Sequence, residues 1–183
     1  MGVNFPVTAH ALEACSRFNA QLFSLTGSMV AFGPGGNSSP HVTIAMGTLR
    51  SGGNLRELED AVAGALSSFP DDDSPPVMAF GPVYRESLTG HYIFADVRFS
   101  ERVQKWRKET QSALAPLFVE PARTTDVPHL TLGHVSVDID RVDAFINTSR
   151  PPIPACGIAS VDISVSGSKG VKQSVLRSFD LAF

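Results

Sequence analysis

The chain has 183 residues, of which 43% are hydrophobic and 18% charged. This length supports one compact domain or two small lobes, with a core that needs no disulfide or metal to fold. The composition is typical of a globular protein and excludes a disordered tail or a fibre. The formal net charge of -3, without a run of Lys or Arg, argues against a protein that binds long duplex DNA through a basic surface.

The sequence also lacks the usual targeting signals. No apolar run approaches the about 18 residues that a membrane span requires, and no basic residue precedes an apolar stretch in Met1–Thr8, so we expect no secretory signal. The two cysteines, Cys15 and Cys156, have no second thiol at ligand spacing and are interpreted as reduced structural thiols. We therefore expect a cytoplasmic monomer that does not associate with membranes.

Four segments carry apolar residues at helical spacing. The first runs from Thr8 to Leu25. Asn54, followed three residues later by Glu57, has the pattern of a helix N-cap and predicts the start of the second helix. Ser100 caps the third predicted helix, and Asp138 opens a shorter fourth one.

Strand-like runs lie between these helices and are bounded by loops rich in Gly and Pro. The predicted strands are Met29–Phe32, His41–Leu49, Val77–Tyr84, Tyr92–Phe99, His129–Val137, Ile158–Ser166 and Val175–Phe183. The alternation of helices and strands predicts an α+β fold.

The order of predicted elements occurs twice along the chain. A helix, a strand that begins with Pro-His, a second helix and two further strands occupy residues 8–99, and the same order returns over 100–183. We therefore expect one domain, 1–183, made of two pseudo-repeats. The predicted architecture is bilobal and duplicated, with two antiparallel sheets and outer helices facing a central cleft, where a ligand site is common.

The two Pro-His strands share one pattern. Residues 40–44 read Pro-His-Val-Thr-Ile, and residues 128–132 read Pro-His-Leu-Thr-Leu. Because strand side chains alternate, His41 and Thr43 share one face, and His129 and Thr131 share the equivalent face of the second strand. The aliphatic residues then pack on the helices, and the His/Thr faces are expected to point into the cleft.

Two imidazoles and two hydroxyls at one site suit metal-free phosphodiester chemistry. One neutral histidine can accept the proton of the attacking water or hydroxyl, and the other, protonated, can donate to the departing oxygen. The threonine hydroxyls can stabilise the charge on the non-bridging oxygens. The near-identical motifs do not show which histidine is the base. Unperturbed imidazoles titrate near pH ~6.5, which predicts a bell-shaped rate profile around that pH.

The paired His-x-Thr strands in a short duplicated chain resemble the 2H phosphoesterase superfamily. That superfamily includes cyclic nucleotide phosphodiesterases, bacterial 2′-5′ RNA ligase-like proteins and 2′,5′-oligoadenylate phosphodiesterases. The resemblance covers nearly the whole chain, although only the two motifs are specific. It implies a bilobal α+β fold and metal-independent attack on phosphodiesters that involve a ribose 2′-oxygen. It also implies that His41 and His129 are catalytic and that Thr43 and Thr131 bind phosphate. Some plant-type members place an aromatic residue where this chain has Val127.

Other residues are weaker predictions for substrate contacts. Lys169, in the turn 167–170, and Arg123, ahead of the second motif, could reach a phosphate. His134 lies on the strand face opposite His129, so it is interpreted as structural or surface-exposed. Aromatic residues that could stack on a base, although each also suits the core, are Phe5, Tyr84, Tyr92 and Phe94.

Three functions remain open at this point. The leading one is hydrolysis of 2′,3′-cyclic phosphates on nucleotides or RNA ends, and the second is cleavage of 2′-5′ linkages in oligoadenylate-type molecules. In both, the partner is a nucleotide or RNA terminus with a cyclic or 2′-linked phosphate, and neither needs a cofactor or metal. The third is a catalytically idle module that binds RNA or nucleotides. Two intact motifs argue against the third function, because binding alone does not need a matched acid and base.

Overall fold

The structure is a computed structural model that describes residues 1–26, 30–33, 35–70, 75–87, 91–121, 127–167 and 171–181. Within these residues the helices are α1 (Ala9–Thr26), α2 (Leu55–Leu66), α3 (Glu101–Leu114) and α4 (Ile139–Thr148), with the short 3₁₀ helix η1 (Ala115–Leu117) after α3. The strands are β1 (Gly2–Pro6), β2 (His41–Leu49), β3 (Val77–Arg85), β4 (Tyr92–Arg98), β5 (Phe118–Pro121), β6 (His129–His134), β7 (Ala155–Gly157), β8 (Ser160–Ser166) and β9 (Lys172–Asp180).

The helices begin where the sequence predicts. Asn54 Oδ1 accepts a hydrogen bond from the Glu57 N–H at 2.9 Å, and Ser100 Oγ accepts one from the Val103 N–H at 3.3 Å. Each bond satisfies a backbone donor that the first turn of a helix leaves without an intrahelical partner. Asp138 precedes α4 differently, with a φ of 53° and without a capping bond from its side chain.

The α+β prediction is confirmed, but the strands are arranged differently from the prediction. The described strands pair antiparallel in one curled sheet, in the order β7-β3-β4-β6-β2-β1-β8-β9, and β5 pairs with β2 beside this path. The prediction of two separate sheets is therefore wrong. In this order, β6 ends one half of the sheet and β2 begins the other, and the two halves join where β2 pairs with β6 near the start of each strand. A single Cα pair, Val42 and Leu130, is in register between them.

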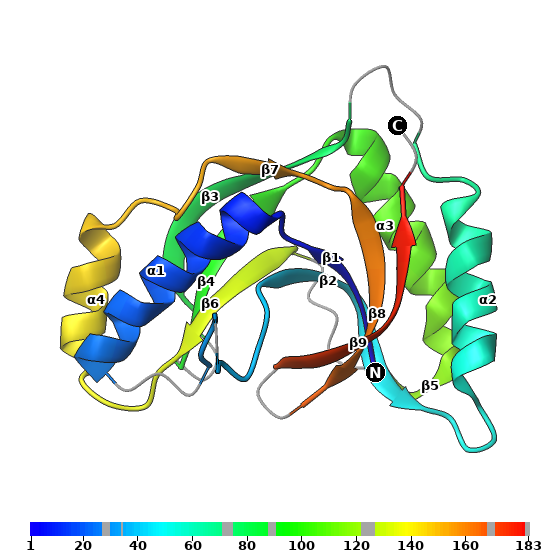
Figure 1. The fold of residues 1–183 in the computed structure, drawn as a ribbon, viewed down its shortest axis with the longest axis horizontal. Helices are drawn as coiled ribbons and strands as arrows, with labels where there is room; N and C mark the ends of the chain where they lie inside the picture. The colour runs from blue at the N-terminus through cyan, green and yellow to red at the C-terminus, as the bar shows by residue number, and fades with distance from the viewer. Residues whose placement is uncertain are drawn as a thin grey trace.

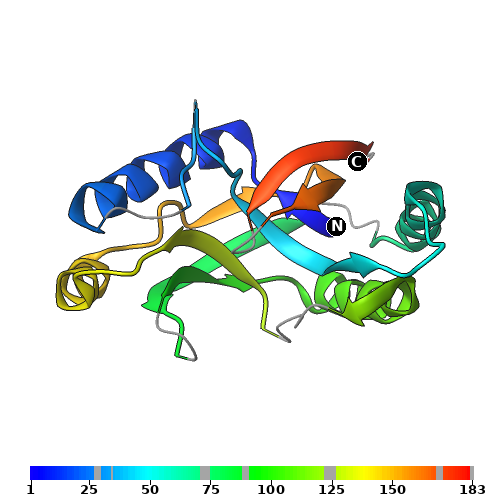
Figure 2. The same cartoon turned by 90° about the horizontal axis from the view of Figure 1, so that it is seen from below.

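The helices lie in two pairs at opposite ends of the molecule, with the strands between them (Figure 1). Helix α1 packs on β6 and α4, and α4 also packs on β3. Helix α3 packs on β2 and α2. A view from below shows the same separation of α1 and α4 from α2 and α3 (Figure 2). Each helix pair therefore combines one helix from residues 8–99 with one from 100–183.

Several strand bounds differ from the prediction. The β2 strand has the predicted bounds, whereas β9 begins at Lys172, earlier than predicted. Residues 30–32 are not in a strand, and Met29 lies outside the described residues. The sequence analysis missed β1, β5 and β7. Strand β1 lies between β2 and β8, and four of its five residues are buried, so this short segment is a central strand. None of the described helices is long and apolar enough to cross a bilayer.

Candidate active site

The two Pro-His strands place their aliphatic residues in the core, as predicted. Val42, Ile44, Leu130 and Leu132 are each 0% exposed. The histidines and threonines of both strands are half-buried. Because α3 packs on β2 and α1 packs on β6, the aliphatic residues supply the contacts with the helices. The His/Thr faces consequently lie on the other side of the sheet.

The pairing of β2 with β6 brings the two motifs together. Counting outward from the one registered pair in antiparallel register sets His41 opposite Thr131 and Thr43 opposite His129. Opposite residues of an antiparallel pair point to the same face of the sheet. All four side chains therefore belong to one patch, in which each histidine lies across from the threonine of the other motif.

Both imidazoles are held by a carbonyl two residues earlier in the chain. His41 Nδ1 donates to the Ser39 carbonyl at 2.7 Å, and His129 Nδ1 donates to the Val127 carbonyl at 3.3 Å. A carbonyl only accepts, so these contacts assign the proton of each neutral ring to Nδ1. Proton exchange with a bound molecule then falls to Nε2 in both motifs.

Burial makes both histidines harder to protonate. It lowers the pKa of His41 to about 4, and the charges of Lys172 and His129 act in the same direction. The bond to Ser39 and the carboxylate of Asp162 oppose this shift in the pKa of His41. The sequence-based value of ~6.5 is that of an unperturbed imidazole, so it does not apply to this ring.

The pKa of His129 is also lowered, first by burial and then by the charge of Arg107, with the Val127 carbonyl acting in the opposite direction. Arg107 comes from α3 and is 2% exposed. Its Nη2 and Nε donate to the Thr43 carbonyl at 3.2 and 3.4 Å. Sequence reasoning missed this arginine, because a charged residue in an amphipathic helix is ordinarily assigned to the solvent face.

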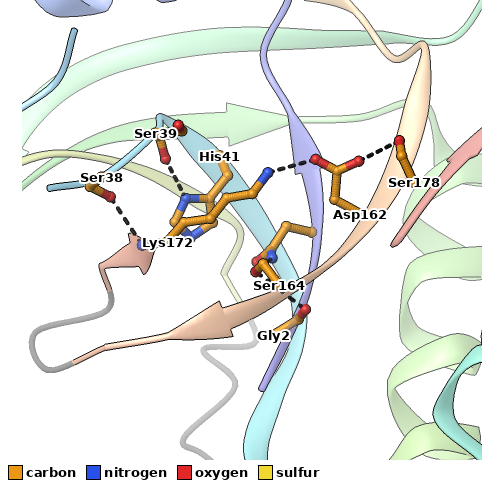
Figure 3. Close-up of polar contacts among 9 residues, drawn as sticks. Gly2, Ser38, Ser39, His41, Asp162, Ser164, Lys172 and Ser178 are labelled. Atoms are coloured by element: carbon orange, nitrogen blue, oxygen red, sulfur yellow. Dashed lines mark hydrogen bonds and ion pairs between the residues drawn. The ribbon is translucent and has the colours of Figure 1, made fainter. Parts of the chain in front are cut away.

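A buried ion pair lies beside His41 (Figure 3). Lys172 Nζ and Asp162 Oδ2 are 2.7 Å apart, and their side chains are 3% and 8% exposed. The Asp162 Oδ1 atom accepts from Ser178 Oγ at 2.7 Å. The sequence analysis did not include either charged residue, although Asp162 interrupts an otherwise regular alternation of Ser and aliphatic residues in β8, which is a detectable signal.

A smaller polar contact joins β1 to β8 near this ion pair. Asn4 Nδ2 donates to Ser164 Oγ at 2.8 Å, and Ser164 Oγ donates to the Gly2 carbonyl at 3.4 Å. Asn4 and Ser164 are 2% and 0% exposed. These two bonds give hydrogen-bond partners to the amide of Asn4 and the hydroxyl of Ser164, as polar groups in a buried position require.

Aromatic rings extend from His129 across β4 and β3. Phe94 stacks on His129 with ring centroids 4.0 Å apart, and Tyr92 stacks on Phe94 at 5.6 Å. Tyr84 meets the edge of Phe94 at 5.9 Å. Tyr84 and Tyr92 are half-buried, so both predicted substrate-contact tyrosines lie in the aromatic row next to the second motif.

The other predicted contacts have different outcomes. Phe5 is 0% exposed and packs on Phe99 and Trp106 at centroid distances of 5.6 and 5.8 Å, so it is a core residue and not a stacking surface. His134 is 3% exposed, with its ring against those of His91 and Tyr92. The prediction that it lies on the face opposite His129 is wrong, because a register shift between β4 and β6 passes over Leu132 and sets His134 opposite Tyr92, whose ring stacks on Phe94 beside His129. Arg123 and Lys169 lie outside the described residues.

No group of three or more His, Cys, Asp or Glu side chains that could hold a metal ion occurs among the residues described by the structure. The two cysteines are buried, and burial raises the pKa of the Cys15 thiol to about 12. A thiol with so high a pKa is a poor nucleophile at neutral pH.

No protein-family model and no curated protein matches this sequence. Among solved structures, the chain is similar to Usb1 of Kluyveromyces marxianus, with a TM-score of 0.51 and 15% identity over 98% of this chain and 95% of Usb1. A second structure, of the same Usb1 with uridine monophosphate, gives a TM-score of 0.48 and 16% identity over 97% and 95% of the two chains. The first comparison shows that this chain shares the fold of Usb1 over nearly its entire length.

Proposed function

We propose that this protein is a metal-independent phosphodiesterase that acts on phosphodiesters involving a ribose 2′-oxygen. Its leading substrates are the 2′,3′-cyclic phosphates of nucleotides or RNA ends. The observation that carries the proposal is the pairing of two equivalent His-x-Thr units in antiparallel register. In each unit a carbonyl two residues earlier holds Nδ1 of the histidine.

In the proposed reaction, a neutral histidine accepts a proton from water at Nε2 while the water oxygen attacks phosphorus. The bond between phosphorus and one ribose oxygen breaks, and the second histidine, protonated, donates its Nε2 proton to that oxygen. Thr43 and Thr131 donate hydrogen bonds to the non-bridging oxygens, where negative charge increases in the transition state. One proton is taken up and one is released, so the pair ends in the opposite protonation state and returns by exchange with solvent.

The arrangement of the helices supports the duplication on which this site depends. Helix α1, from the first half of the chain, packs on β6 of the second half, while α3, from the second half, packs on β2 of the first. This reciprocal exchange is expected if the two halves are repeats related by a pseudo-twofold axis. We therefore propose that the duplicated, bilobal organisation holds, with the repeats interleaved in one sheet.

The row of aromatic rings beside His129 suggests where the nucleoside binds. Tyr84 and Tyr92 are half-buried and lie next to Phe94, which contacts His129. Aromatic faces of this kind stack on nucleobases without strong sequence preference. We propose that these tyrosines contact the base of a nucleotide or RNA terminus whose phosphate lies at the paired motifs.

The decisive experiment compares turnover of 2′,3′-cyclic mononucleotides with turnover of a 2′-5′-linked diadenylate, with products identified by chromatography. We expect the cyclic substrates to be hydrolysed, and His41→Ala and His129→Ala each to lose roughly 10²–10⁴-fold in rate. His10→Ala is the matched control, because His10 is exposed on α1. Hydrolysis of the diadenylate alone would favour 2′-5′ cleavage, and binding of nucleotides without turnover of either would favour the idle binding module.

A further inference from the structure

The buried ion pair between Lys172 and Asp162 has no role in the chemistry proposed so far. The Lys172 side chain is 3% exposed, so its ammonium group cannot bind a phosphate that enters from solvent. Burying two charges carries a large desolvation penalty, and apolar residues of similar size often give equal or better stability. A position for such a pair next to a predicted catalytic histidine therefore suggests a role beyond stability.

Lys172 is linked to His41 through two consecutive serines. The backbone N–H of Lys172 donates to Ser38 Oγ at 3.1 Å, and the carbonyl of the next residue, Ser39, accepts from His41 Nδ1 at 2.7 Å (Figure 3). The first residue of β9 thus holds the segment that orients the imidazole. The ammonium group of Lys172 donates to the carboxylate of Asp162, which also accepts a hydrogen bond from the hydroxyl of Ser178.

The charges around His41 determine where a single proton resides in the histidine pair. The charged or titratable groups that influence its ring are Lys172 from β9, Asp162 from β8 and His129 from β6. Lys172 lowers the pKa of His41 more than Asp162 raises it. For His129 the lowering comes from burial and from Arg107. The ion pair is thus a feature of the first motif only.

We propose that the Lys172–Asp162 ion pair is a positioning unit that orients His41 and keeps it unprotonated, so that His41 is the general base and His129 the general acid. The catalytic part of this inference rests on the proposed phosphodiesterase function. The part that concerns the protonation of His41 does not, and it can be measured in the protein without substrate.

The first experiment is an NMR titration of the imidazole Cε1–H resonances, assigned with His41→Gln and His129→Gln. Lys172→Met removes the positive charge beside His41 and should raise its pKa by about one unit, because the carboxylate of Asp162 then acts on the ring without the opposing ammonium group. The double variant Lys172→Met/Asp162→Asn leaves no unpaired buried charge, and in it the pKa of His41 should lie between those of the single variant and the wild type. It also provides a folded protein if the single variant is unstable.

The matched control is Lys105→Met. Lys105 forms an ion pair with Glu109 at 3.8 Å on α3, but the two side chains are 76% and 63% exposed. This substitution removes the same charge from a solvent-exposed pair, so the pKa of His41 should not change. Lys172→Arg retains the charge, so the pKa of His41 in this variant should stay within a few tenths of a unit of the wild-type value.

The second experiment measures rates on the cyclic substrate across pH. Lys172→Met should reduce kcat by about tenfold, leave KM within about twofold, and move the acid limb of the profile to higher pH. An acid limb unchanged in both Lys172→Met and the double variant, with the His41 resonance also unchanged, would overturn the inference. If the variants show the expected shifts in the pKa of His41 but the wild-type protein hydrolyses no phosphodiester, the proposed function is refuted while the protonation effect stands.

Discussion

The rings of Phe94 and His129 lie face to face, with centroids 4.0 Å apart and planes inclined by 27°. Phe94 comes from β4 and is 9% exposed, so it supports one side of the imidazole while the Val127 carbonyl holds Nδ1. His41 has a different neighbour, the ion pair of Lys172 with Asp162. Two nearly identical sequence motifs therefore have unlike surroundings, and this difference allows the two histidines to take different roles.

Replacing Phe94 with leucine tests this support. Phe94→Leu retains an apolar side chain but removes the flat ring surface, so His129 should occupy more than one orientation. We expect roughly a tenfold loss of kcat and a stability loss of about 1 kcal/mol from the missing ring contact. Steady-state kinetics and denaturant unfolding measure the two effects. Phe145→Leu is the control, because Phe145, in α4, packs on Phe18 of α1 with ring centroids 5.2 Å apart, and this variant should lose stability without losing activity. Equal kinetic losses in both variants would contradict the role of Phe94.

The threonines give a second test. Thr43→Val and Thr131→Val preserve a β-branched shape on strands whose opposite faces are fully buried, so the fold should persist. Each variant loses a donor to the phosphate oxygens, and we expect a rate loss on the order of 10–10³-fold. Thr→Ser at either position should recover most of the rate. Thr48→Val, at an exposed position of the same β2 strand, should retain full activity. Full activity in both Thr43→Val and Thr131→Val would show that these hydroxyls do not bind the phosphate.

The fold was predictable from the sequence wherever local pattern and burial agree. The β2 strand has its predicted bounds, and its first four residues, His41 to Ile44, alternate between half-buried and buried positions as the sequence pattern predicts. The starts of α2 and α3 were also predictable, because Asn54 and Ser100 have side-chain oxygens that cap the first turn of each helix. By contrast, β1 is five residues long and nearly all buried, so its alternation is not visible in the sequence, and its central position depends on pairing with distant strands.

The surroundings of the candidate site were less predictable, because they depend on residues distant in sequence. Lys172 meets Asp162 across a hairpin and Ser38 from another part of the chain. Arg107 reaches Thr43 from a helix whose charged residues are ordinarily assigned to solvent. Sequence patterns predict which face of a strand is apolar. They do not show which charged side chains a fold will bury together, because that depends on tertiary pairing.

The chelator response provides a third test. In the proposed reaction, imidazoles transfer both protons and hydroxyls hold the phosphate, so no step passes through a metal ion. Turnover of the cyclic substrate should therefore remain within about twofold of its original rate after incubation with excess EDTA and gel filtration. Removing metal ions slows only a reaction that uses a metal ion, for example as a Lewis acid. If activity disappears and zinc restores it, His41 and His129 would be reassigned as ligands.

The dependence of rate on pH is the fourth test. In the free protein, the productive state has His41 neutral and His129 protonated. The pKa of His41 is lowered to about 4, so the acid limb of kcat/KM, where the base becomes protonated, should lie near that pH. The pKa of His129 is also lowered, and the alkaline limb, where the acid loses its proton, should therefore fall below the ordinary value of ~6.5.

The optimum of kcat/KM should accordingly lie between these two limbs, on the acid side of the maximum near pH ~6.5 expected for unperturbed histidines. The limbs of kcat should lie at higher pH, because the negative charge of a bound phosphodiester favours the protonated form of both rings. The two apparent pKa values belong to the interacting pair, so His41→Gln and His129→Gln each should abolish the bell shape together with most of the rate. A kcat/KM profile centred above pH ~7, with an acid limb near 6.5, would mean that burial does not perturb these imidazoles in solution.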